Sequence, residues 1–425
     1  MLRISELKLP LDHAPDALAA LIARTLDVPL EAIASHTVYK RSFDARKIEL
    51  LTVYICDVQL KDAKLEAALL AKHAGHPHIQ SAPDMRYTPP ANAAEGTARP
   101  VVVGFGPCGI FAALMLAKMG FRPIVLERGK TVRQRTRDTW GLWRKSVLNP
   151  ESNVQFGEGG AGTFSDGKLY SQIKDPRFLG RKVMEEFVKA GAPPEILYVA
   201  HPHIGTFKLV KVVENIREQI VALGGEIRFE QRVTDVHIED GHLRGLTMLD
   251  QTTGTSSELR ADHVVMALGH SSRDTFEMLH ARGVHIEAKP FSIGFRIEHP
   301  QGLIDKARFG RSIPQLGAAE YRLVHHAKNG RSVYSFCMCP GGTVVAATSE
   351  EGRVATNGMS QYSRNERNAN AGIVVGITPE IDYPGHPLAG IALQRHWESM
   401  AFEAGGGTYA APAQLVSDLR CAKRW

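Results

Sequence analysis

The stretch VVVGFGPCG at residues 101–109 decides the fold, because three valines run directly into a GxGxxG glycine turn. The apolar residues 110–117 then predict a helix that ends near Gly120. A second strand is expected at residues 123–126, and Glu127 comes directly after it. This order of strand, turn, helix, strand and acidic residue predicts an α/β fold of the Rossmann type with a dinucleotide site at the glycine turn.

Each residue of the turn has an expected role. Gly104 permits the tight turn, Gly106 leaves room for a pyrophosphate, and Gly109 lets the helix pack closely on the sheet. The Glu127 carboxylate can accept hydrogen bonds from both ribose hydroxyls and would repel a 2′-phosphate. The alternative is a glycine-rich turn in an α/β protein that binds no nucleotide. The residues expected to hold the ADP half of the cofactor are Gly104, Gly106, Pro107, Gly109, Glu127 and Arg128.

Three later features favour FAD over NAD. The loop NVQFGEGGAGTFSDGKL at 153–169 is a second glycine-rich segment, of the kind that lines a flavin. A strand at 232–236 can contact the adenine through its backbone, and ALGH at 267–270 ends a strand where the chain passes the cofactor again. Each feature alone could be an ordinary turn, but together they predict FAD. They add Gly160, Gly162, Thr163, Val233 and Gly269 to the expected cofactor-binding residues.

The pattern along the chain predicts three domains and a linker. The first part combines a helical apolar period at 18–26 with a strand-like run at 48–55, which indicates an α+β unit. The last part mixes short strands with glycine-rich turns. The expected regions are a small N-terminal α+β domain at 1–88, a linker at 89–98, an FAD-binding Rossmann-type domain at 99–285 and a substrate or cap domain at 286–425.

Composition limits the class of protein. The net charge of +6 on 425 residues is modest and does not by itself indicate nucleic-acid binding. The five cysteines have no framework spacing, which predicts a reducing compartment, and no run of about 20 apolar residues predicts a membrane span. The histidine pairs at 201/203 and 325/326 lack cysteine or acidic neighbours, so no metal site is expected. We therefore expect a cytoplasmic protein.

Several strings of the sequence are similar to one known family. They include HIGT at 203–206, LGHSSRDT at 268–275, FCMCPGG at 336–342 and NGMS at 357–360, besides 104–129 and 157–169. These strings resemble the bacterial family of uncharacterised FAD-dependent dehydrogenases, a group of NAD(P)/FAD-dependent oxidoreductases. The resemblance implies a two-domain flavoprotein fold, FAD as cofactor and an unassigned reaction.

The same resemblance raises an expectation about the C-terminus. Flavoproteins of this class return to the Rossmann domain through a late strand–helix junction that holds the flavin ring, and nothing after Gly390 has that pattern. The chain is therefore expected to be C-terminally truncated by on the order of 100 residues of such a domain layout. Weak FAD binding and loss of activity would follow from such a truncation.

Candidate catalytic groups are few. His270 follows Gly269 and could donate a proton, or it could be a histidine satisfied by the backbone at a strand end. Cys337 and Cys339 are two apart in a strand-like run, so their thiols should share one face and could exchange electrons with a flavin, or be small buried residues. The basic run at 128–137 is expected to be a solvated helix face, with neutralisation of phosphates as the alternative.

These observations predict an FAD-dependent oxidoreductase that transfers a hydride through the flavin to or from a small-molecule substrate. No second GxGxxG follows, so any NAD(P)H donor would bind only transiently over the flavin. The alternatives are a flavin-binding RNA-modifying protein and an inactive flavoprotein fragment. Nucleic-acid binding is disfavoured because no basic patch with interleaved aromatic residues is present.

Overall fold

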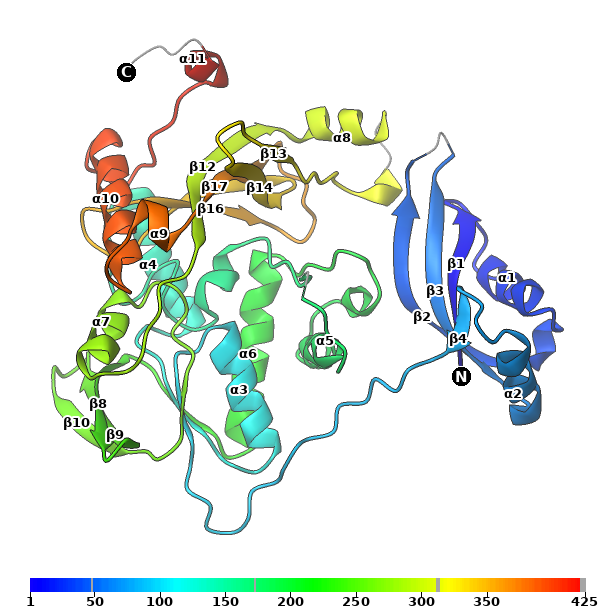
Figure 1. The fold of residues 1–425 in the computed structure, drawn as a ribbon, viewed down its shortest axis with the longest axis horizontal. Coiled ribbons are helices and arrows are strands. Elements are labelled where there is room, and N and C mark those ends of the chain that lie inside the picture. Colours follow the sequence, from blue (N-terminus) through cyan, green and yellow to red (C-terminus); the bar gives the residue numbers. More distant parts are fainter. Residues whose placement is uncertain (47–48, 172, 311–313, 421–425) are drawn as a thin grey trace. The chain divides into compact units, whose positions relative to one another are not determined.

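The computed structural model describes residues 1–46, 49–171, 173–310 and 314–420 (Figure 1). These residues form two compact units, each assembled from segments that are separate in the sequence. Unit one consists of Met1–Thr88, Lys168–Ile204 and Asp305–Ala319. Unit two consists of Pro89–Gly167, Gly205–Ile304 and Glu320–Trp425.

Unit one is built on an antiparallel sheet with the strand order β2-β3-β1-β4. Its strands are β1 (Leu2–Pro10), β2 (Ile33–Asp44), β3 (Leu51–Leu60) and β4 (Ile79–Ser81). The helices α1 (Ala17–Leu26) and α2 (Ala63–Lys72) pack on it through a buried core that includes Leu18, Ile22 and Leu69. The helix and strand expected from 18–26 and 48–55 are therefore α1 and β3, although Ile48 lies outside the described residues.

The second segment of unit one joins β2 by backbone pairing. Arg41 forms a parallel bridge with Val199, in which its N–H donates to the carbonyl of Tyr198 at 2.6 Å. This segment carries α5 (Leu179–Lys189) and the short 3₁₀ helix η3 (Pro194–Leu197), and the third carries η4 (Pro314–Leu316). Helix α8 (Gln301–Phe309) is shared between the two units.

Unit two contains the parallel sheet that the glycine motif predicts. Its strand order is β11-β5-β6-β7, and every neighbouring pair is parallel. The strands are β5 (Val101–Val103), β6 (Ile124–Leu126), β7 (Glu226–Arg228) and β11 (Val264–Met266). Helices α3 (Pro107–Lys118) and α6 (Thr206–Ala222) contact this sheet and each other (Figure 1). The α/β prediction of a Rossmann-type core is confirmed.

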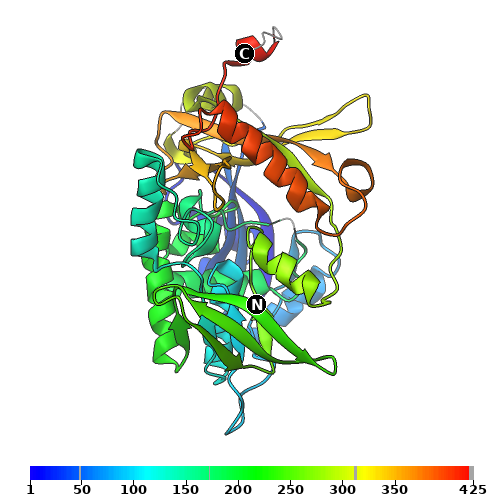
Figure 2. The same ribbon diagram turned by 90° about the vertical axis from the view of Figure 1, so that its left-hand side faces the viewer.

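The opposite face of the parallel sheet is covered by a small antiparallel sheet of order β10-β9-β8, green in Figure 2. Its strands are β8 (Gln231–Glu239), β9 (His242–Asp250) and β10 (Ser256–Arg260). Val101 and Val103 share a core with Leu246 and Met248 of this sheet. Because side chains alternate along a strand, Val102 points to the other face, where it is equally buried. Burial on both faces explains why β5 and β6 are apolar at every position.

The C-terminal part of unit two is mainly antiparallel. A sheet of order β12-β17-β14-β13 carries a hairpin, β15–β16. The strands are β12 (Phe291–Pro300), β13 (Val324–His326), β14 (Ser332–Cys339), β15 (Gly342–Ala347), β16 (Ala355–Ser360) and β17 (Asn368–Ile377). The remaining helices are α4 (Val132–Lys145), η2 (Gly160–Phe164), α7 (Arg273–Ala281), α9 (Pro379–Asp382), α10 (Ala389–Ala404) and α11 (Val416–Arg420). Within the part of the chain that the structure describes, no helix combines the length and the apolar character needed to cross a membrane.

An ion-pair network ties α7 to α10. Arg273 donates to Glu350 at 2.6 Å and to both oxygens of Glu398, and Arg395 donates to both oxygens of Glu350. Burial opposes ionisation of Glu350, but the hydrogen bonds from Arg395 and Arg273 outweigh it and lower the pKa of Glu350 to about 2. The carboxylate therefore stabilises the folded state only while it is ionised.

This lowered pKa predicts how stability depends on pH. The contribution of Glu350 is present above its ordinary pKa near 4.5 and is lost as the pH falls towards 2. Glu350→Gln should lower the free energy of unfolding at pH 7 by about 1 kcal/mol, a small value because solvent screens the network. Denaturant unfolding from pH 7 to pH 3 should show the difference from wild type shrinking with the pH. Glu351→Gln, at an exposed neighbour, is the control, and a difference independent of pH would contradict the assignment.

Candidate active site

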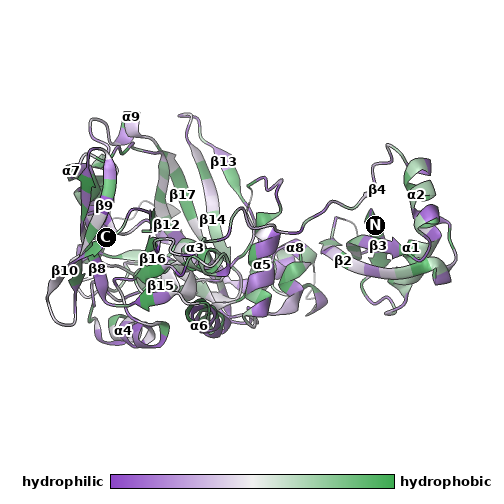
Figure 3. Ribbon diagram, turned by 90° about the horizontal axis from the view of Figure 1, so that it is seen from below, coloured by the Kyte–Doolittle hydropathy of each residue, from purple (hydrophilic) through white to green (hydrophobic). Residues whose placement is uncertain are grey.

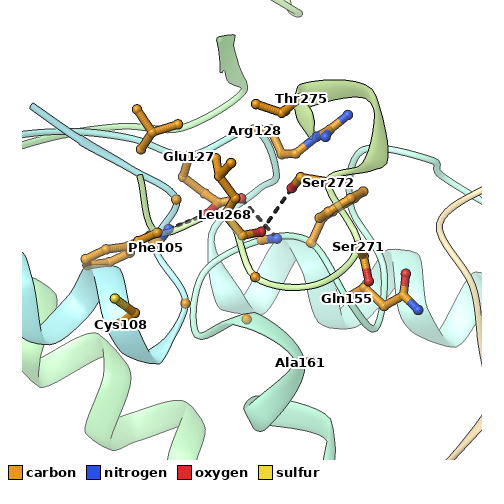
Figure 4. A pocket seen from close by; sticks show the side chains of 18 of the residues that line it. Phe105, Cys108, Glu127, Arg128, Gln155, Ala161, Leu268, Ser271, Ser272 and Thr275 are labelled. Atoms are coloured by element: carbon orange, nitrogen blue, oxygen red, sulfur yellow. Dashed lines mark hydrogen bonds between the residues drawn. The ribbon is translucent and has the colours of Figure 1, made fainter. Parts of the chain in front are cut away.

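One pocket of unit two lies where the parallel strands end at their carboxyl side (Figure 4). It is walled by the turn after β5, the residues after β6, the loop before η2, the start of β8 and the turn between β11 and α7. In open α/β sheets this edge is where ligands bind. The lining residues used below are Gly104, Gly106, Pro107, Cys108, Glu127, Arg128, Gln155, Phe156, Gly157, Gly160, Gly162, Arg232, Val233, Gly269, His270, Ser271, Ser272 and Thr275.

The three glycines of the first turn differ in what surrounds them. At Gly104, where φ is +97°, an added Cβ would lie 2.5 Å from the carbonyl oxygen of Ala267. At Gly109 it would lie 1.9 Å from the carbonyl oxygen of Gly104, so this glycine lets α3 touch the turn. At Gly106 the nearest atom is 3.5 Å away, and φ is −79°. Gly106 is thus the position where the protein itself would tolerate a methyl group.

The start of α3 is open to an anion. Gly106 is its N-cap and provides no side-chain cap, and Pro107 has no N–H to satisfy. The second glycine loop faces the same point, since a Cβ on Gly160 would lie 2.9 Å from Cα of Gly106. Two backbones therefore border this part of the pocket without side chains. A cradle free of side chains at an uncapped helix N-terminus fits the pyrophosphate of FAD.

Glu127 ties three segments of this site together. It is 4% exposed, and its Oε2 accepts from the N–H of Phe105 at 2.7 Å. Its Oε1 accepts from the N–H groups of Gly129 at 2.8 Å and Gly157 at 3.1 Å. The expected hydrogen bonds to a ribose stay a prediction, but the carboxylate also connects the first glycine turn, the end of β6 and the second loop.

Arg135 is the buried counterpart of Glu127. It is 0% exposed and donates to the carbonyl oxygens of Asn153, Val154 and Glu158 at 2.7 Å each. Burial lowers the pKa of Arg135 to about 10, and the nearby carboxylates of Glu127 and Glu158 oppose that shift. The guanidinium therefore holds the second loop by its backbone carbonyls.

The expectation of a solvated basic face at 128–137 is wrong for Arg135. Helix α4 is mostly hydrophilic in Figure 3, yet this one arginine points inward. Arg133, one of its neighbours, is 68% exposed at its side chain and pairs with Glu214 at 2.6 Å. Charge patterning along a helix could not separate the two residues, because the buried one is satisfied by carbonyls of a segment distant in sequence.

Arg128 lies in the pocket wall with its charge already paired. It donates to Glu151 and Asp274 through two hydrogen bonds each, and its guanidinium lies 4.2 Å from the centre of the Phe156 ring. Burial opposes the charge, but the hydrogen bonds to Glu151 and Asp274 outweigh it and raise the pKa of Arg128. Arg128 therefore forms part of the pocket wall with its positive charge already balanced by two carboxylates.

The structure brings together most of the cofactor-binding residues expected from the sequence. Gly109 and Thr163 do not line the pocket. Gly109 packs α3 on the turn, and the buried hydroxyl of Thr163 has no partner among the described residues. The expected residues that line the pocket are Gly104, Gly106, Pro107, Glu127, Arg128, Gly160, Gly162, Val233 and Gly269.

Sequence reasoning missed several lining residues. Gln155 lies at the start of the second glycine loop, and Ser271 and Ser272 come shortly after Gly269, so their nearness to the motif glycines was the available signal. The Ser272 hydroxyl donates to the carbonyl of Leu268 at 3.0 Å and shapes the turn before α7 (Figure 4). Arg232 lies next to Val233 in the strand expected to contact the adenine, but nothing in the sequence distinguished its side chain as a lining group.

His270 lines the pocket. One of its ring nitrogens, Nδ1, lies 2.8 Å from the hydroxyl oxygen of Ser271. Desolvation, together with the positive charge of Arg273, lowers the pKa of His270. The ring is therefore neutral near pH 7, and its Nε2 can accept a proton when Nδ1–H donates to Ser271.

Cys337 and Cys339 do not follow the expected alternation. A register shift lies between Phe336 and Cys339, and Cys337 has a φ of +46°, so the strand is irregular there. Cys339 is 0% exposed and its thiol donates to the carbonyl of Cys337 at 3.4 Å. Both remain thiols, and neither lines the pocket. Because simple alternation fails at an irregular strand, the shared face of the two thiols no longer follows from their spacing, and their exchange of electrons with a flavin stays a prediction.

Comparison with known proteins identifies the class. Residues 98–288 match the family model described as FAD binding domain, and residues 290–424 match that described as FAD-dependent protein, C-terminal domain-like. Residues 1–59 match a domain of unknown function. The protein is FAD-dependent, and FAD is its cofactor.

An uncharacterised protein of Clostridium beijerinckii is 46% identical over 424 residues, which are 98% of this chain and 77% of that protein. The chain belongs to this family of FAD-dependent proteins. The expected loss of a C-terminal segment stays a prediction.

Solved structures of other proteins show weaker similarity to this chain. A glycerol-3-phosphate dehydrogenase of Bacillus halodurans in complex with FAD is 12% identical, with a TM-score of 0.34 over 77% of this chain and 52% of that one. A 3-ketosteroid dehydrogenase of Rhodococcus jostii is 13% identical, with a TM-score of 0.32 over 59% and 69%. This chain thus spans about half the length of the Bacillus enzyme.

Removal of the buried guanidinium should collapse the second loop. Arg135→Met should lower the free energy of unfolding by about 3 kcal/mol or more, because it leaves buried carbonyls unpaired. It should also abolish FAD retention. Arg133→Met on the same helix is the control and should change stability by at most about 1 kcal/mol. Denaturant unfolding and the ratio of flavin to protein measure both effects; equal effects from the two variants would contradict this role.

Gly106 allows a test of the pyrophosphate cradle. Gly106→Ala should leave stability unchanged, because the new methyl group meets nothing closer than 3.5 Å and φ is −79°. Calorimetry should show FAD binding at least about tenfold weaker, because the methyl group takes space needed by the pyrophosphate. Gly302→Ala, in α8 with no neighbour within 4 Å, is the control. Unchanged affinity in Gly106→Ala would show that the pyrophosphate lies elsewhere.

Proposed function

We propose that this protein is an oxidoreductase that transfers a hydride between a small-molecule substrate and bound FAD, with NAD(P)H as a transient donor. The pocket carries the proposal, because two glycine loops and the open start of α3 form one cradle fitted to a flavin dinucleotide. When bound, FAD supplies two-electron redox chemistry, and the protein orients it.

The protein's own contribution to the chemistry is proposed to lie at His270. It lines the pocket, and the contact of its Nδ1 with the Ser271 hydroxyl fixes the direction of its ring. The lowered pKa keeps Nε2 available to accept a proton near pH 7. His270 would therefore hold or move the proton that accompanies the redox step.

Anaerobic mixing with NADH or NADPH tests the proposed donor. The visible absorbance of the bound flavin should bleach with one nicotinamide, and a screen of acceptors should restore it. If neither nicotinamide bleaches a flavin that dithionite reduces, NAD(P)H is not the donor and the reductant must be the substrate itself.

The proposed role of His270 predicts a selective loss of rate. His270→Asn should slow turnover by roughly 100-fold, the range for a lost acid–base group, and leave flavin content unchanged. The fall in rate that protonation of His270 causes on the acid side, below its ordinary pKa of 6.5, should disappear with it. His263→Asn, at an exposed histidine, is the control. An unchanged rate and pH profile in His270→Asn would exclude the residue from proton transfer.

A further inference from the structure

Two strings that mark the family, FCMC and NGMS, converge on one side chain outside the FAD pocket. Arg296 of β12 donates to the carbonyl of Cys337 at 3.2 Å and to Oδ1 of Asn370 at 2.9 Å. Cys337, whose carbonyl accepts this hydrogen bond, lies in the irregular part of β14 and has a left-handed φ of +46°. Gly358, the glycine of NGMS, lies against the same pair.

Because Gly358 has no side chain, the side chains of Arg296 and Asn370 fit against the backbone of β16. A Cβ there would lie 2.4 Å from Oδ1 of Asn370 and 2.7 Å from Nη1 of Arg296. The hairpin strand β16 therefore approaches the guanidinium with bare backbone. The motif glycine is explained by the arginine beneath it.

The guanidinium of Arg296 forms no ion pair with a carboxylate among the described residues. Both groups that accept its hydrogen bonds are neutral, whereas the arginines at 128, 273, 331, 364 and 395 all pair with carboxylates. Glu298, two residues along the strand, accepts from Asn368 instead. Arg296 is half-buried, and an oxyanion would give its guanidinium the charge-assisted hydrogen bonds that the neutral acceptors do not supply.

The side chain of Asn370 is a second observation that supports a functional role for Arg296. It is 0% exposed, and its Nδ2 has no hydrogen-bond partner. A buried donor without a partner destabilises the fold. Its one hydrogen bond from the guanidinium orients Arg296, so we interpret Asn370 as a positioning residue.

The surroundings suggest the shape of a ligand. Arg296 and Phe336 both pair with Gly372, so they share one face of the sheet with a bare glycine between them. Their backbones are about 10 Å apart, two strand spacings. Phe336 is 63% exposed. The face thus offers a cation at one end and an aromatic ring at the other.

This face is connected to the FAD pocket by the hairpin. Asn357, next to Gly358, donates to the carbonyl of Phe164 in η2 at 3.0 Å, and η2 begins at Gly160 in the pocket wall. Met359 packs with Val154 and Phe164. Contacts made by β16 therefore link Arg296 to the second glycine loop of the FAD pocket.

We propose that Arg296 binds the anionic group, a carboxylate or a phosphate, of an apolar substrate. The inference rests on the proposed function, because it names the substrate class of that flavin reaction. The guanidinium has only donors and a planar fork, which match an oxyanion that has only acceptors. Phe336 contacts the apolar body of the same molecule.

Calorimetry on the FAD-loaded protein tests the proposal with three probes: benzoate, phenyl phosphate and uncharged benzamide. At least one of the two anions should bind, and whichever binds more tightly identifies the anionic group. Benzamide should bind at least tenfold more weakly. Arg296→Gln should weaken the anion at least tenfold and Arg296→Lys less, because the ammonium keeps the charge without the fork.

Asn370→Asp keeps the proposal testable should Arg296→Gln unfold the protein. The new carboxylate would neutralise Arg296 internally, so the fold should be at least as stable while anion affinity falls at least tenfold. Arg331→Gln, which removes an arginine already paired with Asp382, is the control and should leave affinity unchanged.

Flavin content and reduction, measured in the same samples, separate the two levels of proposal. Loss of FAD binding in wild type would overturn the proposed function. FAD-loaded wild type that binds neither anion, or binding that survives both Arg296→Gln and Asn370→Asp, would overturn the role of Arg296 alone.

Discussion

The site depends on two opposite charges buried among backbone groups of one loop. The guanidinium of Arg135 takes carbonyls of residues 153–158, and the carboxylate of Glu127 takes the N–H of Gly157 in the same loop. Neither charge could be buried without these partners, because an ionised group loses its hydration on burial. The loop conformation that satisfies both charges sets Gly160 against Gly106 and so forms the cradle.

The C-terminal sheet is joined to that loop by a third buried charge, the carboxylate of Asp166. Asp166 is 1% exposed, accepts from Nε of Arg364 at 3.0 Å and pairs with Ser360 at the end of NGMS. Asn357, at the start of the same string, holds the carbonyl of Phe164. The first and last residues of NGMS thus connect the hairpin to the second glycine loop. Gly358, which lies between them, faces Arg296. Asn357, Gly358 and Ser360 of NGMS therefore each have a structural role.

Part of this architecture was predictable from local pattern. A strand of three valines, a glycine turn and an acidic residue after the next strand suffice to predict the parallel core, because each signal acts over a few residues. The same reasoning went wrong at Arg135 and does not apply at Cys337, where the strand is irregular. A basic helix face is normally solvated and a strand normally alternates, but distant carbonyls bury the arginine and a register shift interrupts the strand. Neither partner is visible in a local window.

The sequence by itself therefore determined the Rossmann-type core, the glycine turn and the FAD dependence, since these follow from backbone geometry that short motifs require. Only the tertiary structure decided which charges are buried, which glycines face the pocket and where FCMC and NGMS meet. Those features depend on contacts such as Glu127 with Gly157 or Arg296 with Asn370, which join residues 30 and 74 positions apart. Hydrogen bonds across such separations carry no periodicity in the sequence. Only the folded chain shows that Arg296 lies on the sheet without an ion-pair partner among the described residues.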